Sequence, residues 1–441
     1  MSLFGAMNTA ISGLNAQSNA FGNISDNVAN SQTIGFKRVD TTFVDYLTTS
    51  TAAVNDPGAV VAKPSYINNI QGAITQTDNP LGLAIAGQGF FAVSQQTGQI
   101  NGVPTFNPQQ FYTRAGDFQL NATGYMVNSA GQYLNGWPID PTTGNINQNT
   151  LKPIQVTQTV YNPVATNNVV LSANLPATPA AGTGTVDSPI SSDINVYDAL
   201  GTAHTVTLDW VQNAASDWTV SVNAADDVGG AARGTADVQF GAVSGNAVPE
   251  GTVGQISAAT GSVATAGYAA GTAATLSFTD DFGSGPQTIT LNIGTYGQTN
   301  GVTQYAGTAY DLRGLTQDGV PPGAFAGVST QANGSIIVNY DNGQTRRIAQ
   351  VPLVTFNSPD ALQRQDGQSF SATIDSGTPL AEQASTNGAG NLVTNSVESS
   401  NVDIASEFSQ LIVAQQAYSA NAKIVTTADT MLQTTLQMKQ Q

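Results

Sequence analysis

The stretch that decides the fold is residues 399–441, SSNVDIASEFSQLIVAQQAYSANAKIVTTADTMLQTTLQMKQQ. Apolar residues recur in it at steps of three and four, which is the spacing of a helix with a coiled-coil seam. Asn401 is the expected N-cap, and Asp403 is expected in the first turn. The residues expected to pack between helices or between subunits are Ile404, Phe408, Leu411, Tyr418, Val425, Leu432 and Leu436. A second apolar row, which includes Ile424 and Met431, predicts that this helix needs partners on more than one side.

The first 30 residues repeat the same alternation and predict a second, shorter helix. Its expected seam residues are Phe4, Met7, Ile11, Leu14, Phe21 and Val28. Gly5, Gly13 and Gly22 lie inside the pattern, and each costs about 1 kcal/mol relative to Ala in a helix interior. We therefore expect the two terminal helices to pair with each other and with neighbouring molecules. The alternative is that both helices pack onto the chain's own globular domain.

Composition narrows the class of protein. The chain has 441 residues, which is long enough for two to four domains. Only 9% of its residues are charged, and such a neutral, polar surface suits close packing of identical subunits. The 12 basic and 29 acidic residues give a net charge of -17, which argues against nucleic-acid binding. There is no cysteine, no apolar run long enough for a membrane span and no pattern of a cleavable secretory signal.

Between the two ends the sequence predicts mainly β structure. Strand alternation appears around Trp210, Trp218 and Leu291, and residues 341–343 have the sequence of a hairpin turn. The predicted fold is therefore multidomain, with an α-helical coiled-coil terminal domain and mainly-β inner and outer domains. The expected domains are residues 1–30 with 399–441 (helical), 31–70 with 375–398 (extended connectors, with a turn at 56–58), 71–151 with 334–374 (inner β domain) and 152–333 (outer inserted β structure, as one domain or two). In this nested order the two ends of the chain form the innermost domain and the middle of the chain forms the outermost one.

Two motifs at the ends resemble the signatures shared by bacterial flagellar rod and hook proteins. The first is NISDNVAN at 23–30 with TIGFKR at 33–38, and the second is ESSNVD at 398–403 with QQAY at 415–418. The segment VYDALGTAH at 196–204 resembles hook proteins more than the shorter rod proteins. The signature residues that carry the resemblance are Asn30, Gly35, Phe36, Lys37, Ser400, Asn401, Val402, Gln415 and Tyr418.

The resemblance implies a structural subunit of the flagellar hook. Such a subunit polymerises outside the cell into a curved hollow tube that acts as a universal joint between rod and filament. The implied partners are copies of the chain itself, a rod protein at the base, a hook–filament junction protein at the tip, and a hook cap and the type III export apparatus during assembly. The alternatives are a distal rod protein or, in another class, a secreted β-rich adhesin or enzyme.

No residue pattern predicts catalysis, a cofactor or a metal. His204 is the only histidine, and without cysteine the usual nucleophile and base pairs are missing, so we expect a surface role for it. The Asp pairs at 226–227 and 280–281 lack the alternating oxygen ligands of a calcium loop and are interpreted as turns. Arg114, close to Asp117, is interpreted as part of a structural ion pair.

Overall fold

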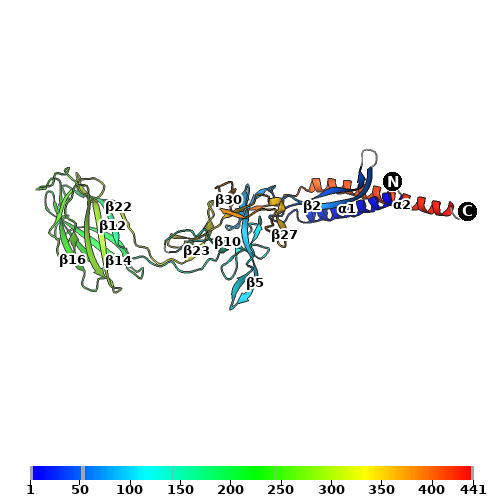
Figure 1. Ribbon diagram of the computed structural model, residues 1–441. Helices are drawn as coiled ribbons and strands as arrows, with labels where there is room; N and C mark the ends of the chain where they lie inside the picture. The colour runs from blue at the N-terminus through cyan, green and yellow to red at the C-terminus, as the bar shows by residue number, and fades with distance from the viewer. Residues whose placement is uncertain (1–2, 51–54, 142, 244, 439–441) are drawn as a thin grey trace. The chain divides into compact units, whose positions relative to one another are not determined.

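The computed structural model describes residues 3–50, 55–141, 143–243 and 245–438, and the chain divides into two compact units (Figure 1). The first, called here the terminal unit, contains Met1–Gln158, Ala326–Asn339 and Thr345–Gln441. The second, called the insert unit, contains Thr159–Phe325 and Tyr340–Gln344. Each unit has its own apolar core. The predicted combination of terminal helices and a mainly-β middle is confirmed.

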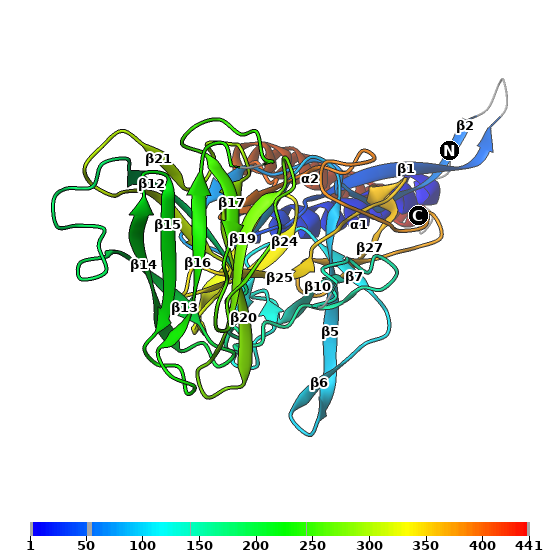
Figure 2. The ribbon, with the colours of Figure 1, turned by 90° about the vertical axis from the view of Figure 1, so that its left-hand side faces the viewer.

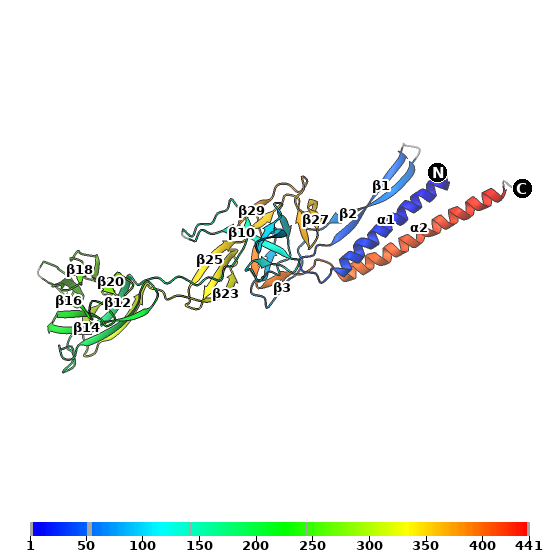
Figure 3. The same cartoon turned by 90° about the horizontal axis from the view of Figure 1, so that it is seen from below.

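Two helices, α1 (Leu3–Ala29) and α2 (Ile404–Met438), run antiparallel and side by side in the terminal unit (Figure 3). Asn27 near the end of α1 contacts Glu407 near the start of α2. Further from this end of the pair, the ring of Phe21 on α1 packs edge-on against the ring of Tyr418 on α2. The pairing of the two ends of the chain therefore agrees with the expectation from the two seams.

A long β-hairpin follows α1, made of β1 (Val39–Ser50) and β2 (Asn55–Tyr66). The sequence predicts an extended connector here, and the structure differs because polar side chains of α1 hold the hairpin against the helix. Ser12 Oγ accepts the Val60 amide at 3.1 Å, and Thr9 Oγ1 donates to Gly58 O at 3.2 Å. The turn expected at 56–58 is strand, with a register shift beside it. Such polar contacts leave no hydrophobic period in the sequence.

The main sheet of the terminal unit is 14-stranded over the described residues. Its longest path is β23 (Phe325–Thr330), β24 (Ser335–Tyr340), β25 (Thr345–Gln350), β10 (Gln132–Pro138), β5 (Phe90–Ile100), β7 (Phe111–Thr113), β28 (Ser369–Ser371) and β27 (Gln363–Gln365). The branches are β6 (Val103–Phe106), β8 (Gln119–Leu120), β9 (Met126–Val127), β11 (Lys152–Pro153), β26 (Leu353–Thr355) and β29 (Leu380–Glu382), with the 3-10 turn Pro359–Ala361 close by. The predicted hairpin turn at 341–343 is confirmed between β24 and β25.

The second expected connector, residues 375–398, also takes part in pairing. Its strands β29, β30 (Asn391–Thr394) and β31 (Ser396–Glu398) pair with β26, β4 (Leu83–Ala86) and β3 (Ile74–Gln76) in that order. Strands β30 and β31 thus fix the chain on its way back to α2 to strands from the first half of the unit.

The insert unit consists of two sheets around one core, and Figure 2 shows its strands side by side. One sheet is β13 (Ile190–Tyr197), β14 (Ala203–Ala214), β15 (Asp217–Ala224), β16 (Ala232–Phe240) and β17 (Val253–Ser257). The other is β12 (Asn168–Pro176), β18 (Ala264–Thr265), β19 (Ala273–Asp281), β20 (Pro286–Thr295), β21 (Thr303–Tyr305) and β22 (Asp311–Gln317). The predicted alternation is confirmed, because Trp210, Trp218 and Leu291 are fully buried between the sheets.

Candidate assembly surface and terminal junction

Three charged side chains, Lys37, Arg114 and Glu398, meet in the interior of the terminal unit and are called here the junction cluster. Lys37 Nζ lies 2.6 Å from Glu398 Oε1, and Arg114 Nη1 lies 3.0 Å from Glu398 Oε2. The three come from distant parts of the chain: the segment between α1 and β1, the end of β7, and the end of β31. At most 3% of any of these side chains is exposed. The cluster therefore ties both terminal signatures to the β core.

Backbone carbonyls also accept hydrogen bonds from the two cations of the junction cluster. Lys37 Nζ donates to Ile70 O at 2.6 Å, and Arg114 donates to Gly87 O at 2.7 Å. Burial lowers the pKa of Lys37, while the carboxylate of Glu398 opposes that shift. Removing one member of such a buried group leaves the others uncompensated, which costs far more than loss of a surface pair.

Gly35 allows the N-terminal signature segment, residues 33–38, to lie close against the backbone at Ala115. Its backbone has φ +69°, in the left-handed region, and a Cβ there would lie 2.3 Å from Ala115 N. The Gly35 amide donates to Glu398 O at 2.8 Å. Only glycine fits this conformation and this spacing.

Asn401 acts as a clamp on the backbone and is not the N-cap that the sequence predicts. Its Oδ1 accepts the Arg38 amide at 2.8 Å, and its Nδ2 donates to Ile67 O and Ile70 O. Asp403 caps α2 instead, because its Oδ1 accepts the amide of Ala405 at 2.9 Å. Asn401 lies too far before the helix to reach those amides, since α2 begins at Ile404.

The remaining signature residues surround this junction or lie on the helices. Phe36 is buried under the guanidinium of Arg364, which lies 4.4 Å from the ring centroid. Asn30 donates to Asp26 just after α1. Ser400 accepts the Val402 amide at 3.3 Å, whereas Gln415 and Tyr418 are exposed on α2.

Arg114 pairs with Glu398 and not with Asp117, so the interpretation of a local ion pair is wrong in its partner. Asp117 Oδ2 accepts the Ser129 amide at 3.2 Å instead. The fold brings Glu398 to Arg114 across 284 positions of sequence, and a local reading of the motif cannot find that contact.

Small and polar residues, rather than the expected seam residues, fill the face of α1 that packs in a single chain. The buried positions are Ala10, Gly13, Ala16, Ala20, Ile24 and Asn27. A Cβ on Gly13 would lie 2.9 Å from Asn421 Nδ2, so α2 approaches closely here. The packing face of α1 could have been identified in the sequence from small residues at steps of three and four, because small residues allow close helix packing.

The expected seam residues lie around the edge of the helix contact or in solvent. Half-buried members are Met7, Leu14, Phe21, Val28, Leu411, Val425 and Leu432. Exposed members are Phe4, Ile11, Ile404, Phe408, Tyr418 and Leu436, with Phe4 64% and Phe408 52% exposed. Their role in packing between subunits remains a prediction, and the single chain leaves much of their apolar surface available.

Glu407 lies on the face of α2 that packs against α1, and its side chain is buried. Asn27 Nδ2 donates to its Oε1 at 3.2 Å, and among the described residues its Oε2 has no hydrogen-bond partner. Burial raises the pKa of Glu407, the Asn27 hydrogen bond opposes the shift, and the nearby Asp40 adds to it.

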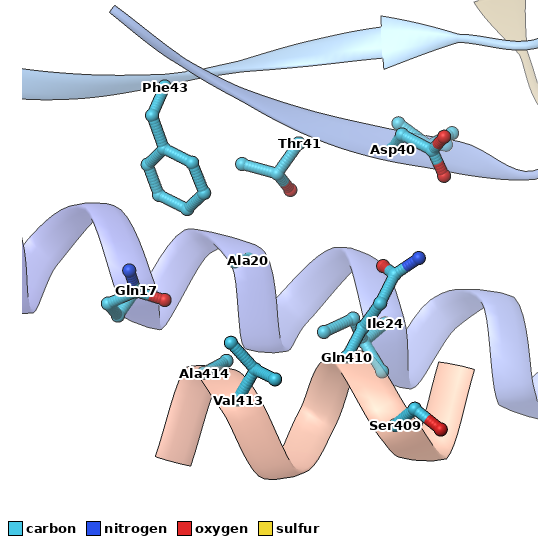
Figure 4. A pocket seen from close by; sticks show the side chains of 11 residues that line it. Gln17, Ala20, Ile24, Asp40, Thr41, Phe43, Ser409, Gln410, Val413 and Ala414 are labelled. Atoms are coloured by element: carbon cyan, nitrogen blue, oxygen red, sulfur yellow. The ribbon is translucent and has the colours of Figure 1, made fainter. Parts of the chain in front are cut away.

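A groove of about 330 Å³ opens between the two helices and β1 (Figure 4). Its walls are mainly apolar, with Ile24 from α1, Phe43 from β1 and Val413 from α2. The amides of Gln17 and Gln410 stand on its rim (Figure 4). An apolar groove beside exposed apolar helix faces is typical of a surface that packs against protein.

No group of His, Asp and Glu side chains in the described ranges has an arrangement that could hold a metal ion. Within those same ranges, no helix is long and apolar enough to cross a membrane.

Four family profiles match successive parts of the chain, from the N-terminal helix through the β domains to the C-terminal helix. They are "Flagella basal body rod protein" at residues 7–37, "Flagellar hook protein FlgE/F/G D1 domain" at 84–173, "Flagellar basal body protein FlaE D2 domain" at 170–320 and "Flagellar basal body rod FlgEFG protein C-terminal" at 393–438. The junction cluster joins segments covered by the first, second and fourth profiles. The matches define the class as rod and hook proteins of the bacterial flagellum.

Full-length relatives narrow the class. The flagellar hook protein FlgE of Brucella abortus is 31% identical over 100% of both chains, and that of Escherichia coli K12 is 28% identical over 98% of this chain and 100% of its own. The crystal structure of Helicobacter pylori flagellar hook protein FlgE2 matches with a TM-score of 0.47 and 14% identity, over 72% of this chain and 98% of that one. The chain belongs to the flagellar hook protein family and is a structural subunit of the bacterial flagellar hook.

Proposed function

We propose that this chain polymerises into a curved hollow tube that works as a universal joint between rod and filament. The observation that carries the proposal is the exposure of large apolar side chains along α1 and α2, among them Phe4, Phe408 and Leu436. Burying one such side chain contributes about 1.5–3 kcal/mol, so a few per helix suffice for a stable assembly.

The helices form the inner packing layer in this proposal. The groove between α1, α2 and β1 accepts the exposed apolar face of a helix from a neighbouring subunit. Few charges interrupt these faces, because α2 carries only Glu407, Lys423 and Asp429 between Ile404 and Met438. Close packing of identical copies therefore meets little electrostatic repulsion.

Bending requires parts that keep their shape while they move. The terminal unit and the insert unit each have a separate apolar core, so each can move as a body without exposing that core. A subunit of this kind lengthens and shortens along the tube as the joint rotates.

Specific partners follow from the same role. They are a rod protein at the base, a junction protein at the tip, and a cap and the type III export apparatus during assembly outside the cell. The absence of cysteine supports export of an unfolded chain, because no disulfide has to be undone. The weak helix propensity of α1, with Gly5, Gly13 and Gly22 in its interior, supports it as well.

The test is electron microscopy of the purified chain in precipitating salt, beside the variant Phe408→Asp. We expect curved hollow tubes from the native chain and none from the variant, because a carboxylate would be desolvated in the helix packing. The control is Val186→Asp, at an 82% exposed site of the insert unit, which should still form tubes.

Circular dichroism shows whether each variant keeps its helices and strands. Tubes from Phe408→Asp that match the native ones would contradict packing through α2. Straight tubes from the native chain would contradict the proposed curved joint.

A further inference from the structure

Six charged or titratable side chains gather at one end of the insert unit, where the turns after β13, β15 and β19 meet. We call them the acid cluster: Asp198, His204, Asp226, Asp227, Arg233 and Asp280. They belong to both sheets, since β19 lies in one sheet, whereas β13, β14, β15 and β16, which carry or precede the other five residues, lie in the second. The cluster therefore links the two layers of the unit.

His204 lies between two carboxylates and stacks on an aromatic ring. Its Nδ1 is 3.2 Å from Asp226 Oδ2, and its Nε2 is 3.8 Å from Asp198 Oδ2. Phe282 lies parallel to the imidazole, with ring centroids 4.0 Å apart. A neutral imidazole can donate to only one of the two carboxylates, whereas an imidazolium presents an N–H to each. The expectation of a surface role is thus replaced by a position inside the cluster, with 10% of the side chain exposed.

The carboxylate of Asp227 has several hydrogen-bond partners, whereas that of Asp280 has none among the described residues. Asp227 accepts the amides of Gly229 and Asp281 at 2.6 Å each and pairs with Arg233 at 2.9 Å. Asp280 is 1% exposed, and neither of its oxygens has a hydrogen-bond partner among the described residues. Its nearest cation is Arg233, whose Nε lies 3.6 Å from Oδ1.

The charges of the acid cluster do not balance when every carboxylate is ionised. Four aspartates face one arginine, which leaves a net charge of three negatives with His204 neutral. Burial raises the pKa of Asp280 to about 6, Asp227 adds to the shift, and Arg233 and His204 oppose it. A proton bound in the cluster reduces the buried negative charge.

We propose that the acid cluster is a proton-operated latch, which holds the three turns together when Asp280 is protonated and loosens them when that proton leaves. The effect reaches the segments by which the chain enters and leaves the unit. A Cβ on Gly201 would lie 2.4 Å from Pro322 and 2.7 Å from Pro163, so the turn after β13 packs tightly on both segments.

The direction of the effect follows from linkage. The folded pKa of Asp280 lies above the ordinary aspartate value of 3.8, so the folded state binds more protons between the two values. The stabilisation is complete below 3.8 and is lost as the pH rises through about 6. From a shift of this size, the unfolding equilibrium constant of the insert unit should increase about tenfold between about pH 5 and about pH 7.5.

The first measurement is denaturant unfolding of the full chain in a Trp137→Phe background. Trp210 and Trp218 then report on the insert unit alone, because they are the other two tryptophans of the chain. Asp280→Asn should abolish the tenfold change with pH and stabilise the unit at about pH 7.5. The matched control Asp187→Asn, at an exposed site of the same unit, should keep the native dependence on pH.

The second measurement is the imidazole C2–H resonance of His204 in the full chain, which is free of overlap because there is one histidine. In the native chain it should show an additional inflection from Asp280, and Asp280→Asn should remove that inflection. Identical titration curves for both proteins, or equal pH dependence of unfolding, would overturn the latch.

Discussion

The insert unit buries most of its large apolar side chains within itself, whereas the helix pair of the terminal unit leaves most of its own exposed. Trp210, Trp218 and Phe278 lie between the two sheets of the insert unit with at most 1% exposed. In the helix pair most buried positions are small or polar, such as Ala16, Ala20 and Glu407, and Ile24 is the large apolar residue among them. The insert unit therefore has a complete apolar core in a single chain, whereas the helix pair has apolar faces that no other part of its own chain covers.

The difference shows where the free energy of each region comes from. A sandwich with its own core is stable in a single chain because apolar area leaves water on folding. A two-helix pair with exposed apolar faces gains that free energy only on association, in the way of a helix in a bundle. The four changes below test this contrast, in order of their expected effect on the stability of the single chain.

Trp210→Ala should have an effect as large as any of the four, a loss of about 3–5 kcal/mol in the unfolding of the insert unit, because it leaves a cavity in a closed core. Denaturant unfolding followed by near-ultraviolet circular dichroism measures it. The control Val186→Ala, at an exposed site, should stay within about 0.5 kcal/mol. A small loss for Trp210→Ala would mean that the sandwich core is not closed.

Glu398→Ala should cost about 3–5 kcal/mol in the terminal unit, since Lys37 and Arg114 would be buried without their anion. Thermal unfolding of the purified variant measures the loss. Glu382→Ala is the matched control, because Glu382 is only partly buried and accepts a hydrogen bond from the neutral side chain of Asn387. Equal melting of both variants would show that the junction cluster does not hold the signatures to the core.

Glu407→Gln should stabilise the helix pair by about 1 kcal/mol near neutral pH, because it removes a desolvated charge and keeps an acceptor for Asn27. The folded pKa of Glu407 lies above the ordinary glutamate value of 4.5, so the native chain loses stability as the pH rises through the raised pKa. Helix melting at 222 nm over a range of pH measures both. A gain that persists below pH 4.5 would contradict this cause.

Phe408→Ala should have the smallest effect on the single chain, within about 0.5 kcal/mol, because the ring is already exposed. The same change should slow or prevent tube formation, measured by light scattering and electron microscopy. A large loss of stability in the monomer would show that the ring packs within its own chain, and the contrast between the two regions would fail.

Much of the architecture could be predicted because local periodicity carries it. Strands around Trp210, Trp218 and Leu291 alternate with a period of two, and both helices repeat at three and four. The hairpin β1–β2 could not be predicted in this way, because its contacts to Thr9 and Ser12 are polar and depend on α1 lying beside it.

The face that α1 uses within the chain was also beyond the sequence. Large apolar residues such as Phe4 and Ile11 mark the seam by their hydrophobicity, yet Ala16 and Ala20 are the residues buried. Which of two helix faces meets its own partner depends on how closely the backbones approach, and small side chains permit the closer approach.

By itself the sequence determined the helices at both ends, the β-rich middle and the resemblance to flagellar rod and hook proteins. These features rest on neighbours within a few positions, or on motifs that are continuous in the chain. Only the tertiary structure decided that Glu398 joins Lys37 and Arg114, and that His204 and Asp280 share one buried cluster. Such contacts join residues far apart in sequence, and their burial and charge exist only once the chain has closed around them.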